Sequence, residues 1–317
     1  MNAVVLAWLA LCMIWGSTWL FIKLGLRDLP PFTFVGIRFL LASIILSLVI
    51  YFRRIRLPQN RRDWQFIAWT GFLCVTVNFA LVFWAGQYVS SGLAALLNAT
   101  MPFFGMLIAP HYLPAERITP AKVGGMMLGL LGVGLIFSNQ LSVQGALSLL
   151  ACIAIVAGAL VAAYANILIK LRGRHLDPII LSTGQMLFGF PVLLGIGVIA
   201  EGNPLHLTWT PLALASLSYL TIIGSCVAFI VYFWMLQRIA VTKALVLLLV
   251  TPLVAVTLGK LVNNEELTWR LLAGGACIIS GVGATIFYRQ RTPASSPVNK
   301  IVTRPLQLQE APVTYES

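Results

Sequence analysis

The chain has 317 residues, of which 59% are hydrophobic and only 9% are charged, and its mean hydropathy is +0.92. A soluble globular domain carries about 25% charged residues, so this composition cannot form a water-exposed surface and excludes that class. The formal net charge of +12 could suggest a nucleic-acid partner, but its distribution along the chain, described below, explains it better.

Ten apolar segments follow one another along the chain, each close to the roughly 20 residues that a helix needs to cross the hydrocarbon core of a membrane. They are Val4–Ile22, Pro31–Phe52, Trp64–Ala85, Ser90–Ile108, Ala121–Phe137, Ala146–Leu168, Ile179–Ala200, Pro211–Leu236, Ala244–Val262 and Leu271–Tyr288. No cationic region precedes the first segment, so we expect a retained helix and not a cleaved signal peptide. Residues 291–317, rich in Pro, Ser, Thr and Gln, are typical of a disordered cytoplasmic tail.

The second half of the chain repeats the first at an offset of 147 to 150 residues. Recurring pairs include Lys23/Lys170, Pro31/Pro178, Phe79/Phe229, Trp84/Trp234, Pro102/Pro252, Glu116/Glu266 and Gly125/Gly275. An odd number of spans per repeat places the second copy in the membrane upside down, as in secondary transporters with inverted repeats. We therefore predict an all-α membrane protein of ten transmembrane helices, with one five-helix repeat over residues 1–142 and an inverted one over residues 143–290.

Basic residues divide unequally between the two sides of this predicted topology. Sixteen Lys and Arg residues fall on the side of the N-terminus and four on the other side. Because cytoplasmic loops carry the excess of Lys and Arg, both termini and Arg56 are predicted to be cytoplasmic. Lys23 and Glu266 are then outside.

A membrane enzyme would need titratable groups or metal ligands that converge within the bilayer. The three histidines, His111, His175 and His206, lie in predicted loops, and all nine carboxylates lie in loops, in the tail or at helix ends. We therefore predict that the protein is not an enzyme and that it has no catalytic residue, metal site or cofactor. The same distribution argues against a buried carboxylate as a proton site.

Arg38 is the only charged residue well inside a predicted span. It follows Pro31 by seven residues, which places it about 10 Å from the outer end of its helix. An Arg at that depth costs several kcal/mol unless it faces a polar cavity or a partner. It either draws an anionic or carboxylate group into a cavity, or it satisfies backbone carbonyls and fixes neighbouring helices. Gln185 is its counterpart in the second half.

Other polar and aromatic side chains within the spans complete a predicted site. A Pro inside a span frees a backbone carbonyl and persists where it lines a cavity or a hinge, and paired interrupted segments in two halves point to a midplane site. The predicted hinges are Gly16, Pro102 and Pro252. The predicted substrate-binding residues are Trp15, Ser17, Trp19, Arg38, Asn78, Trp84, Asn98, Thr100, Tyr164, Asn166, Gln185, Ser225, Tyr232, Trp234 and Thr251. Helix packing without a ligand is the alternative interpretation of each.

Several short motifs carry a resemblance to a known family. Ile14-Trp15-Gly16-Ser17-Thr18, Arg38-Phe39 after Pro31, and Thr251-Pro252-Leu253-Val254-Ala255-Val256 before Glu265-Glu266 resemble the drug/metabolite transporter superfamily, and its EamA-type branch in particular. The resemblance covers roughly residues 1 to 290. It implies a central cavity between the repeats, alternating access, and export of amino acids or other small metabolites from bacteria.

These observations together predict a permease of the bacterial inner membrane. We expect a secondary transporter that exports small organic metabolites such as amino acids or carboxylates, acts as a monomer or homodimer, and has no nucleic-acid partner. One alternative is a multidrug or toxic-compound exporter with a broad aromatic cavity. The other is a non-transporting membrane interaction protein, in which Arg38 and the prolines serve packing alone.

Overall fold

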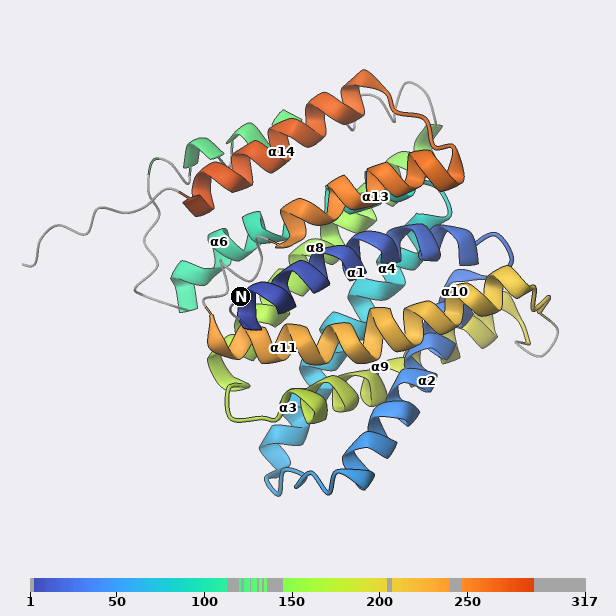
Figure 1. Ribbon diagram of the computed structural model, residues 1–317, viewed down its shortest axis with the longest axis vertical. Coiled ribbons are helices and arrows are strands. Elements are labelled where there is room, and N and C mark those ends of the chain that lie inside the picture. Colours follow the sequence, from blue (N-terminus) through green and yellow to red (C-terminus); the bar gives the residue numbers. More distant parts are fainter. Residues whose placement is uncertain are drawn as a thin grey trace, which may run out of the picture. The chain divides into compact units, whose positions relative to one another are not determined.

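The computed structural model describes residues 3–112, 145–203, 207–239 and 247–287, with isolated positions between 120 and 135. Every regular element in these ranges is a helix, and all of them belong to one unit, Met1–Phe287 (Figure 1). The predicted tail, residues 291–317, lies outside the described residues.

Twelve α-helices are described in chain order, together with two π-helical segments, η1 and η3. The first half has α1 (Ala3–Gly25), α2 (Pro31–Phe52), α3 (Arg61–Gly71), η1 (Phe72–Val77), α4 (Asn78–Gly86), α5 (Ser91–Asn98) and α6 (Met101–Tyr112). The second half has α8 (Gly145–Arg172), α9 (Pro178–Glu201), α10 (Pro211–Thr221), η3 (Ile222–Val227), α11 (Ala228–Arg238), α13 (Leu247–Asn263) and α14 (Trp269–Phe287).

Seven helical stretches of the described residues are long and apolar enough to cross a membrane, and one shorter apolar helix lies at Val250–Asn263. The all-α membrane fold is therefore confirmed. The fifth predicted span, Ala121–Phe137, lies mostly outside the described residues, so the count of ten helices stays a prediction.

Helix starts follow from local chemistry at their first residues. Pro31, Pro178 and Pro211 each stand in the first turn of a helix, where a missing N–H breaks no hydrogen bond. The Asp177 carboxylate accepts from the Ile179 N–H at 2.7 Å, and the Thr210 hydroxyl accepts from the Ala213 N–H at 3.1 Å. Such side-chain caps satisfy backbone donors that the helix leaves unpaired.

Two lysines cap equivalent helices in the two halves. The Lys23 ammonium donates to the carbonyls of Gly86 and Gln87, at 2.9 and 3.2 Å. Its counterpart Lys170 donates to the carbonyls of Leu236 and Ile239, at 2.6 and 2.7 Å. A cation at a helix C-terminus satisfies free carbonyls and the helix dipole, so the repeat extends to individual hydrogen bonds.

The π-helical segments also repeat, since η1 and η3 stand 150 residues apart. Each bonds to the other half of the chain: the Thr76 hydroxyl donates to the Gly189 carbonyl at 3.1 Å, and the Cys226 thiol to the Ala42 carbonyl at 3.7 Å. Thr76 and Cys226 are equivalent positions, as are Ala42 and Gly189. π-Helical turns are rare and often accompany functional sites.

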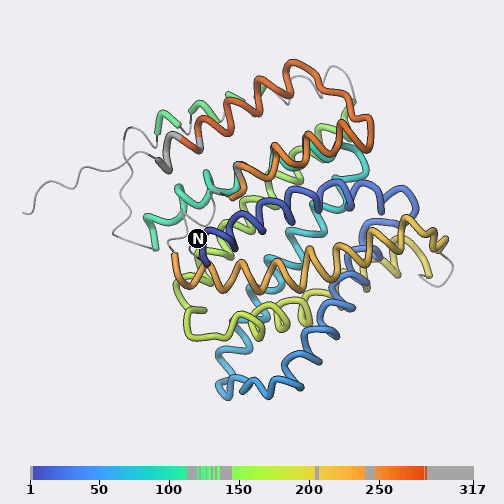
Figure 2. Tube along the Cα trace, viewed as in Figure 1, coloured from blue at the N-terminus to red at the C-terminus, as the bar shows by residue number. Residues whose placement is uncertain are grey.

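Helices of one half pack directly on helices of the other. α2 lies along α9, and α1 lies along α13, as the trace in Figure 2 shows. A Cβ atom at Gly16 would lie 2.5 Å from the Cβ of Val254, so the α1–α13 crossing requires glycine. This close approach fits the small residue that the sequence places there, whereas a hinge at Gly16 stays a prediction.

Two carboxylates of the second half cap helices of the first. Glu201 accepts from the backbone N–H groups of Phe32 and Thr33, both at 2.8 Å. Glu265 accepts from those of Ser91 and Gly92, at 2.9 and 3.2 Å. Negative charge at a helix N-terminus is stabilising, so these carboxylates hold the two halves together.

Candidate functional site

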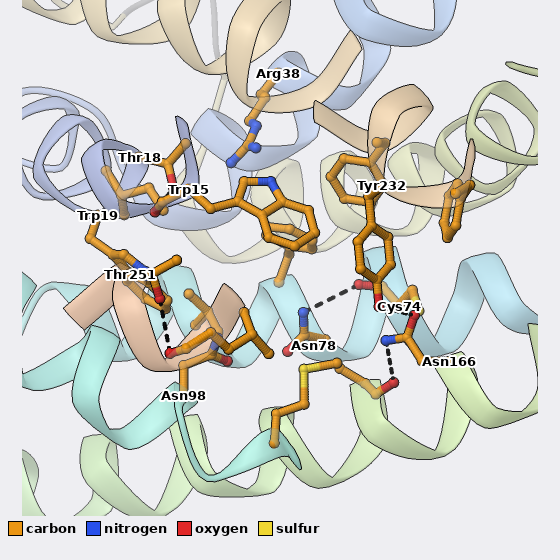
Figure 3. A pocket seen from close by; sticks show the side chains of 18 residues that line it. Trp15, Thr18, Trp19, Arg38, Cys74, Asn78, Asn98, Asn166, Tyr232 and Thr251 are labelled. Atoms are coloured by element: carbon orange, nitrogen blue, oxygen red, sulfur yellow. Dashed lines mark hydrogen bonds between the residues drawn. The ribbon is translucent and has the colours of Figure 1, made fainter. Parts of the chain in front are cut away.

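A cavity of about 120 Å³ lies where α1, α4, α8, α11 and α13 meet (Figure 3). Residues from both halves of the chain line it. They are Trp15, Thr18, Trp19, Ile22, Arg38, Cys74, Asn78, Phe79, Val82, Asn98, Met101, Ala162, Asn166, Phe229, Tyr232, Phe233, Leu248 and Thr251.

Twelve of the lining residues form six pairs at equivalent positions of the two halves. The pairs are Trp15/Ala162, Trp19/Asn166, Phe79/Phe229, Val82/Tyr232, Asn98/Leu248 and Met101/Thr251. Only Phe79 and Phe229 are identical, and the other five pairs place different chemistry at matched positions. The cavity is therefore symmetric in its backbone and asymmetric in its side chains.

Arg38 supplies the one charge among the residues that line the cavity. Its side chain is only 2% exposed. Its Nε donates to the Ser225 hydroxyl at 2.8 Å, and its Nη2 donates to the Gly224 carbonyl at 3.2 Å. Both acceptors belong to η3, so the π-helical segment of the second half holds a guanidinium from the first.

The guanidinium has neutral neighbours only, within the part of the chain that the structure describes. Its Cζ lies 5.1, 5.2 and 5.8 Å from the ring centroids of Phe39, Phe79 and Phe83, distances at which aromatic faces attract a cation. No carboxylate among the described residues pairs with it, and its Nη1 is buried without a hydrogen-bond partner there. One donor of a residue that lines the cavity thus has no partner among the described residues.

Two amides form the polar part of the opposite wall. The Tyr232 hydroxyl donates to Asn166 Oδ1 at 3.0 Å, and Asn166 Nδ2 donates to the Ala162 carbonyl at 2.8 Å. Asn78 Nδ2 donates to the Cys74 carbonyl at 3.4 Å, whereas Asn78 Oδ1 is buried without a partner among the described residues. Residues that line the cavity therefore include one buried acceptor and one buried donor without a hydrogen-bond partner among the described residues.

Aromatic rings separate these two polar groups. The Trp15 ring lies 4.9 Å from that of Tyr232 and 6.2 Å from that of Phe229. In the view of Figure 3, the Trp15 indole lies between Arg38 and Asn78. A ligand that spans both polar groups would contact aromatic surface between them.

The two proline segments beside the cavity differ in geometry. In the first half the helix breaks, since α5 ends at Asn98 and α6 begins at Met101, with Pro102 in the new first turn. In the second half α13 continues through Pro252. The carbonyl that Pro252 leaves free belongs to Leu248, and it accepts from the Thr251 hydroxyl at 3.2 Å.

Eight of the fifteen predicted binding residues line the cavity, and seven do not. Of these seven, Ser225 contacts it indirectly by accepting from Arg38. The hydroxyl groups of Ser17 and Tyr219 are hydrogen-bonded at 2.6 Å. Gln185 is fully buried and donates to the Thr70 hydroxyl at 2.9 Å.

The other four predicted residues have local partners. The Trp84 ring lies 5.3 Å from Tyr88, and the Tyr164 ring 6.0 Å from Tyr112. The Arg238 guanidinium lies 4.2 Å from the ring centroid of Trp234. The Thr100 hydroxyl donates to the Leu97 carbonyl at 2.7 Å.

Ten lining residues were absent from the sequence prediction, most of them apolar. They are Thr18, Ile22, Cys74, Phe79, Val82, Met101, Ala162, Phe229, Phe233 and Leu248. Their residue types do not distinguish them from ordinary core residues. The repeat offset was the available signal for some of these lining residues. It pairs Phe79 with Phe229, Val82 with the predicted Tyr232, and Leu248 with the predicted Asn98.

Comparison with known proteins agrees with this duplicated architecture. The model of the EamA-like transporter family matches the chain twice, over residues 2–138 and 149–287. The chain belongs to this family. It is therefore a membrane transporter by family, and the predicted resemblance is confirmed.

Relatives of similar length support the same assignment. The chain is 28% identical over 287 residues to the uncharacterized transporter YoaV of Bacillus subtilis, covering 90% of this chain and 98% of that protein. It is 29% identical over 283 residues to the uncharacterized inner membrane transporter YedA of Escherichia coli K12, covering 87% and 89%. One solved crystal structure matches with a TM-score of 0.68 at 17% identity, covering 93% of this chain and 99% of that one. That likeness supports the fold alone.

Proposed function

We propose that this EamA-like protein is a secondary transporter that exports small organic metabolites carrying a carboxylate, such as amino acids, across the bacterial inner membrane. The inner-membrane location is transferred from the name of its relative YedA. The observation that carries the proposal is Arg38, a buried cation that lines the central cavity and whose Nη1 has no hydrogen-bond partner among the described residues.

The energetics of Arg38 favour an anionic ligand. A charge removed from water costs several kcal/mol unless an opposite charge and hydrogen bonds compensate it. Ser225 and Gly224 supply neutral acceptors only. A substrate carboxylate would supply the missing charge and accept from the guanidinium in the planar geometry that this group favours.

The rest of the cavity limits the size and chemistry of the substrate. Its volume of about 120 Å³ is smaller than the roughly 300 to 1,000 Å³ typical of pockets that bind drug-sized ligands. Asn78 Oδ1 would accept from an ammonium or amide group at the other end of the ligand. These features favour a compact zwitterion or a substituted carboxylate.

Alternating access would move the two halves, residues 1–142 and 143–290, about this fixed site. The contacts α1–α13 and α2–α9 lie between those halves and would change during the cycle. None of the residues that line the cavity is Asp, Glu or His, so we expect that transport does not depend on a titrating carboxylate within the bilayer.

A multidrug exporter is the second candidate, because a specific observation favours it. Six of the lining residues are aromatic, namely Trp15, Trp19, Phe79, Phe229, Tyr232 and Phe233. Such rings can hold cationic dyes. The positive charge of Arg38 repels the same ligands, so the metabolite proposal is preferred.

Counterflow in proteoliposomes separates these functions. Purified protein would be preloaded in turn with amino acids, organic acids and cationic dyes, and exchange of the radiolabelled compound would be measured. Exchange of carboxylates alone supports the proposal, and exchange of dyes alone supports multidrug export. No exchange in any arm, with protein that is folded and inserted, would favour the non-transporting interaction protein.

A further inference from the structure

A second groove lies at one end of α2, away from the central cavity. Its volume is about 750 Å³. Its walls are formed by α2, the loop that follows it, the start of α3, and α9. These helices are labelled in Figure 1. Apolar side chains dominate the lining, among them Ile50, Ile180 and Leu187. Leu187 is 44% exposed, so this wall faces the surroundings of the helix bundle.

Positive charge is concentrated beside this groove. Five arginines fall within ten residues, and all are exposed: Arg53, Arg54, Arg56, Arg61 and Arg62. None of them has an ion-pair partner within the part of the chain that the structure describes. The adjacent carboxylate, Asp63, accepts instead from His175 at 3.0 Å.

Arg54 lines the groove itself and has an unusual backbone conformation. Its φ is 51°, in the left-handed region where glycine is the common residue after a helix. The Arg54 N–H donates to the Tyr51 carbonyl at 3.2 Å, and the Ile55 N–H donates to the Ile50 carbonyl at 3.1 Å, which is the hydrogen-bond pattern of a Schellman cap. The cap needs no side chain at this position, so the backbone does not account for the arginine.

Aromatic residues mark this end of the bundle as a membrane interface. Tyr51 and Phe52 are each 76% exposed. Trp64 lines the groove, and its indole N–H donates to the Pro58 carbonyl at 2.9 Å. Tyr and Trp, whose rings carry a polar group, gather at the headgroup level of a bilayer, so Tyr51 and Trp64 are typical of such an interface.

We propose that this groove binds an anionic phospholipid such as phosphatidylglycerol. The headgroup phosphate would contact Arg54 at the rim, and an acyl chain would lie along Ile50, Ile180 and Leu187. Basic pockets between membrane helices recognise anionic headgroups in this way. An apolar wall next to unpaired arginines suits an amphipathic anion better than a free phosphate, which leaves the wall uncovered, or a zwitterionic lipid, which leaves the charge unmatched.

Lipid binding to the full-length protein in detergent would test this proposal by native mass spectrometry. Phosphatidylglycerol and phosphatidylcholine with identical acyl chains would be titrated separately, and glycerol 1-phosphate would be added as a competitor. We expect phosphatidylglycerol to bind at least fivefold more tightly than phosphatidylcholine. Arg54→Gly should lower the affinity for phosphatidylglycerol about fivefold and leave that for phosphatidylcholine unchanged.

Two further variants, Arg54→Gln and Arg238→Gln, make the result specific. Arg54→Gly suits the left-handed backbone, whereas Arg54→Gln removes the same charge and keeps a side chain. Both Arg54 variants should lose the preference for phosphatidylglycerol. Arg238→Gln removes an exposed charge outside the groove and should keep it. Equal binding of the two lipids, an unchanged preference in either Arg54 variant, or full competition by glycerol 1-phosphate would each overturn the proposal.

Discussion

Arg38→Gln is the substitution that most directly tests the central site. It copies the counterpart residue Gln185, keeps a hydrogen-bonding side chain and removes the charge. Hydrogen bonds to a charged group contribute about 1.5 to 3 kcal/mol, so losing the contact to a substrate carboxylate should weaken recognition about ten- to a hundredfold. Arg38→Lys should recover part of this, because an ammonium keeps the charge but lacks the planar fork.

The same substitution should leave folding stability nearly unchanged. Two hydrogen bonds from the charged guanidinium, to Ser225 and Gly224, are worth about 1.5 to 3 kcal/mol each. Removing a buried cation that has no counter-ion among the described residues avoids a desolvation cost of similar or larger size. We therefore expect the thermal midpoint in detergent to stay within a few degrees of the wild-type value.

The assay combines counterflow with thermal unfolding for each variant. The half-saturation concentration of a transported carboxylate should rise in Arg38→Gln, while expression and the unfolding midpoint stay near normal. Thr70→Val is the matched control, because it removes the partner of Gln185 outside the cavity and should lower stability without changing substrate affinity. An Arg38→Gln protein that unfolds would support a purely structural role for the arginine, and one that transports with unchanged affinity would remove it from the site.

Three further predictions follow from contacts and topology. Glu265→Gln weakens the cap on α5 and should lower the stability measured by thermal unfolding by about 1 to 2 kcal/mol. Glu266→Gln should have little effect on stability, and equal losses in the two variants would contradict the cap. Thr251→Val leaves the Leu248 carbonyl of α13 without its hydroxyl donor and should lower folding stability by about 1 kcal/mol. Thr257→Val, at an exposed position, should leave stability nearly unchanged. A larger loss in Thr257→Val than in Thr251→Val would refute this reasoning. Arg56→Cys, in a background without native cysteines, should resist labelling from outside intact cells, and strong labelling would reverse the predicted orientation.

The sequence predicted those features of the fold that depend on composition and local chemistry. Long apolar runs gave the membrane helices, and prolines gave the starts of α2 and α10 at Pro31 and Pro211. The recurrence of Pro, Glu and paired Gly at one offset gave the duplication. Arg38 was identified as the notable buried charge because its cost in a membrane is large whatever the surrounding fold.

Features that depend on three-dimensional contacts could not be read in the same way. The π-helical segments involve a hydrogen-bond register that residue types do not encode. The repeat pairs Glu116 with Glu266 but does not single out Glu201 or Glu265, the carboxylates that cap helices of the first half; Glu116 lies outside the described residues. Which of two adjacent carboxylates reaches α5 depends on the path of the loop.

The placement of Gln185 shows why a repeat predicts backbone position better than chemistry. Arg38 reaches η3 because Ser225 offers a hydroxyl there, but the position equivalent to Ser225 in η1 is the buried Val75. Gln185 therefore finds no such acceptor and bonds to Thr70, whose own counterpart is Leu220. Equivalent backbones thus carry different polar partners.

This asymmetry has a consequence for transport. Inverted halves with equivalent packing can exchange conformations at little energetic cost, which alternating access requires. A site that was also chemically symmetric would carry two arginines and would bind a second anion at the mirrored position. One Arg38, opposed by Asn78 and Asn166, would instead give a single orientation to a ligand with one anionic end. The shared scaffold would then provide the motion, and the unmatched side chains would provide the recognition.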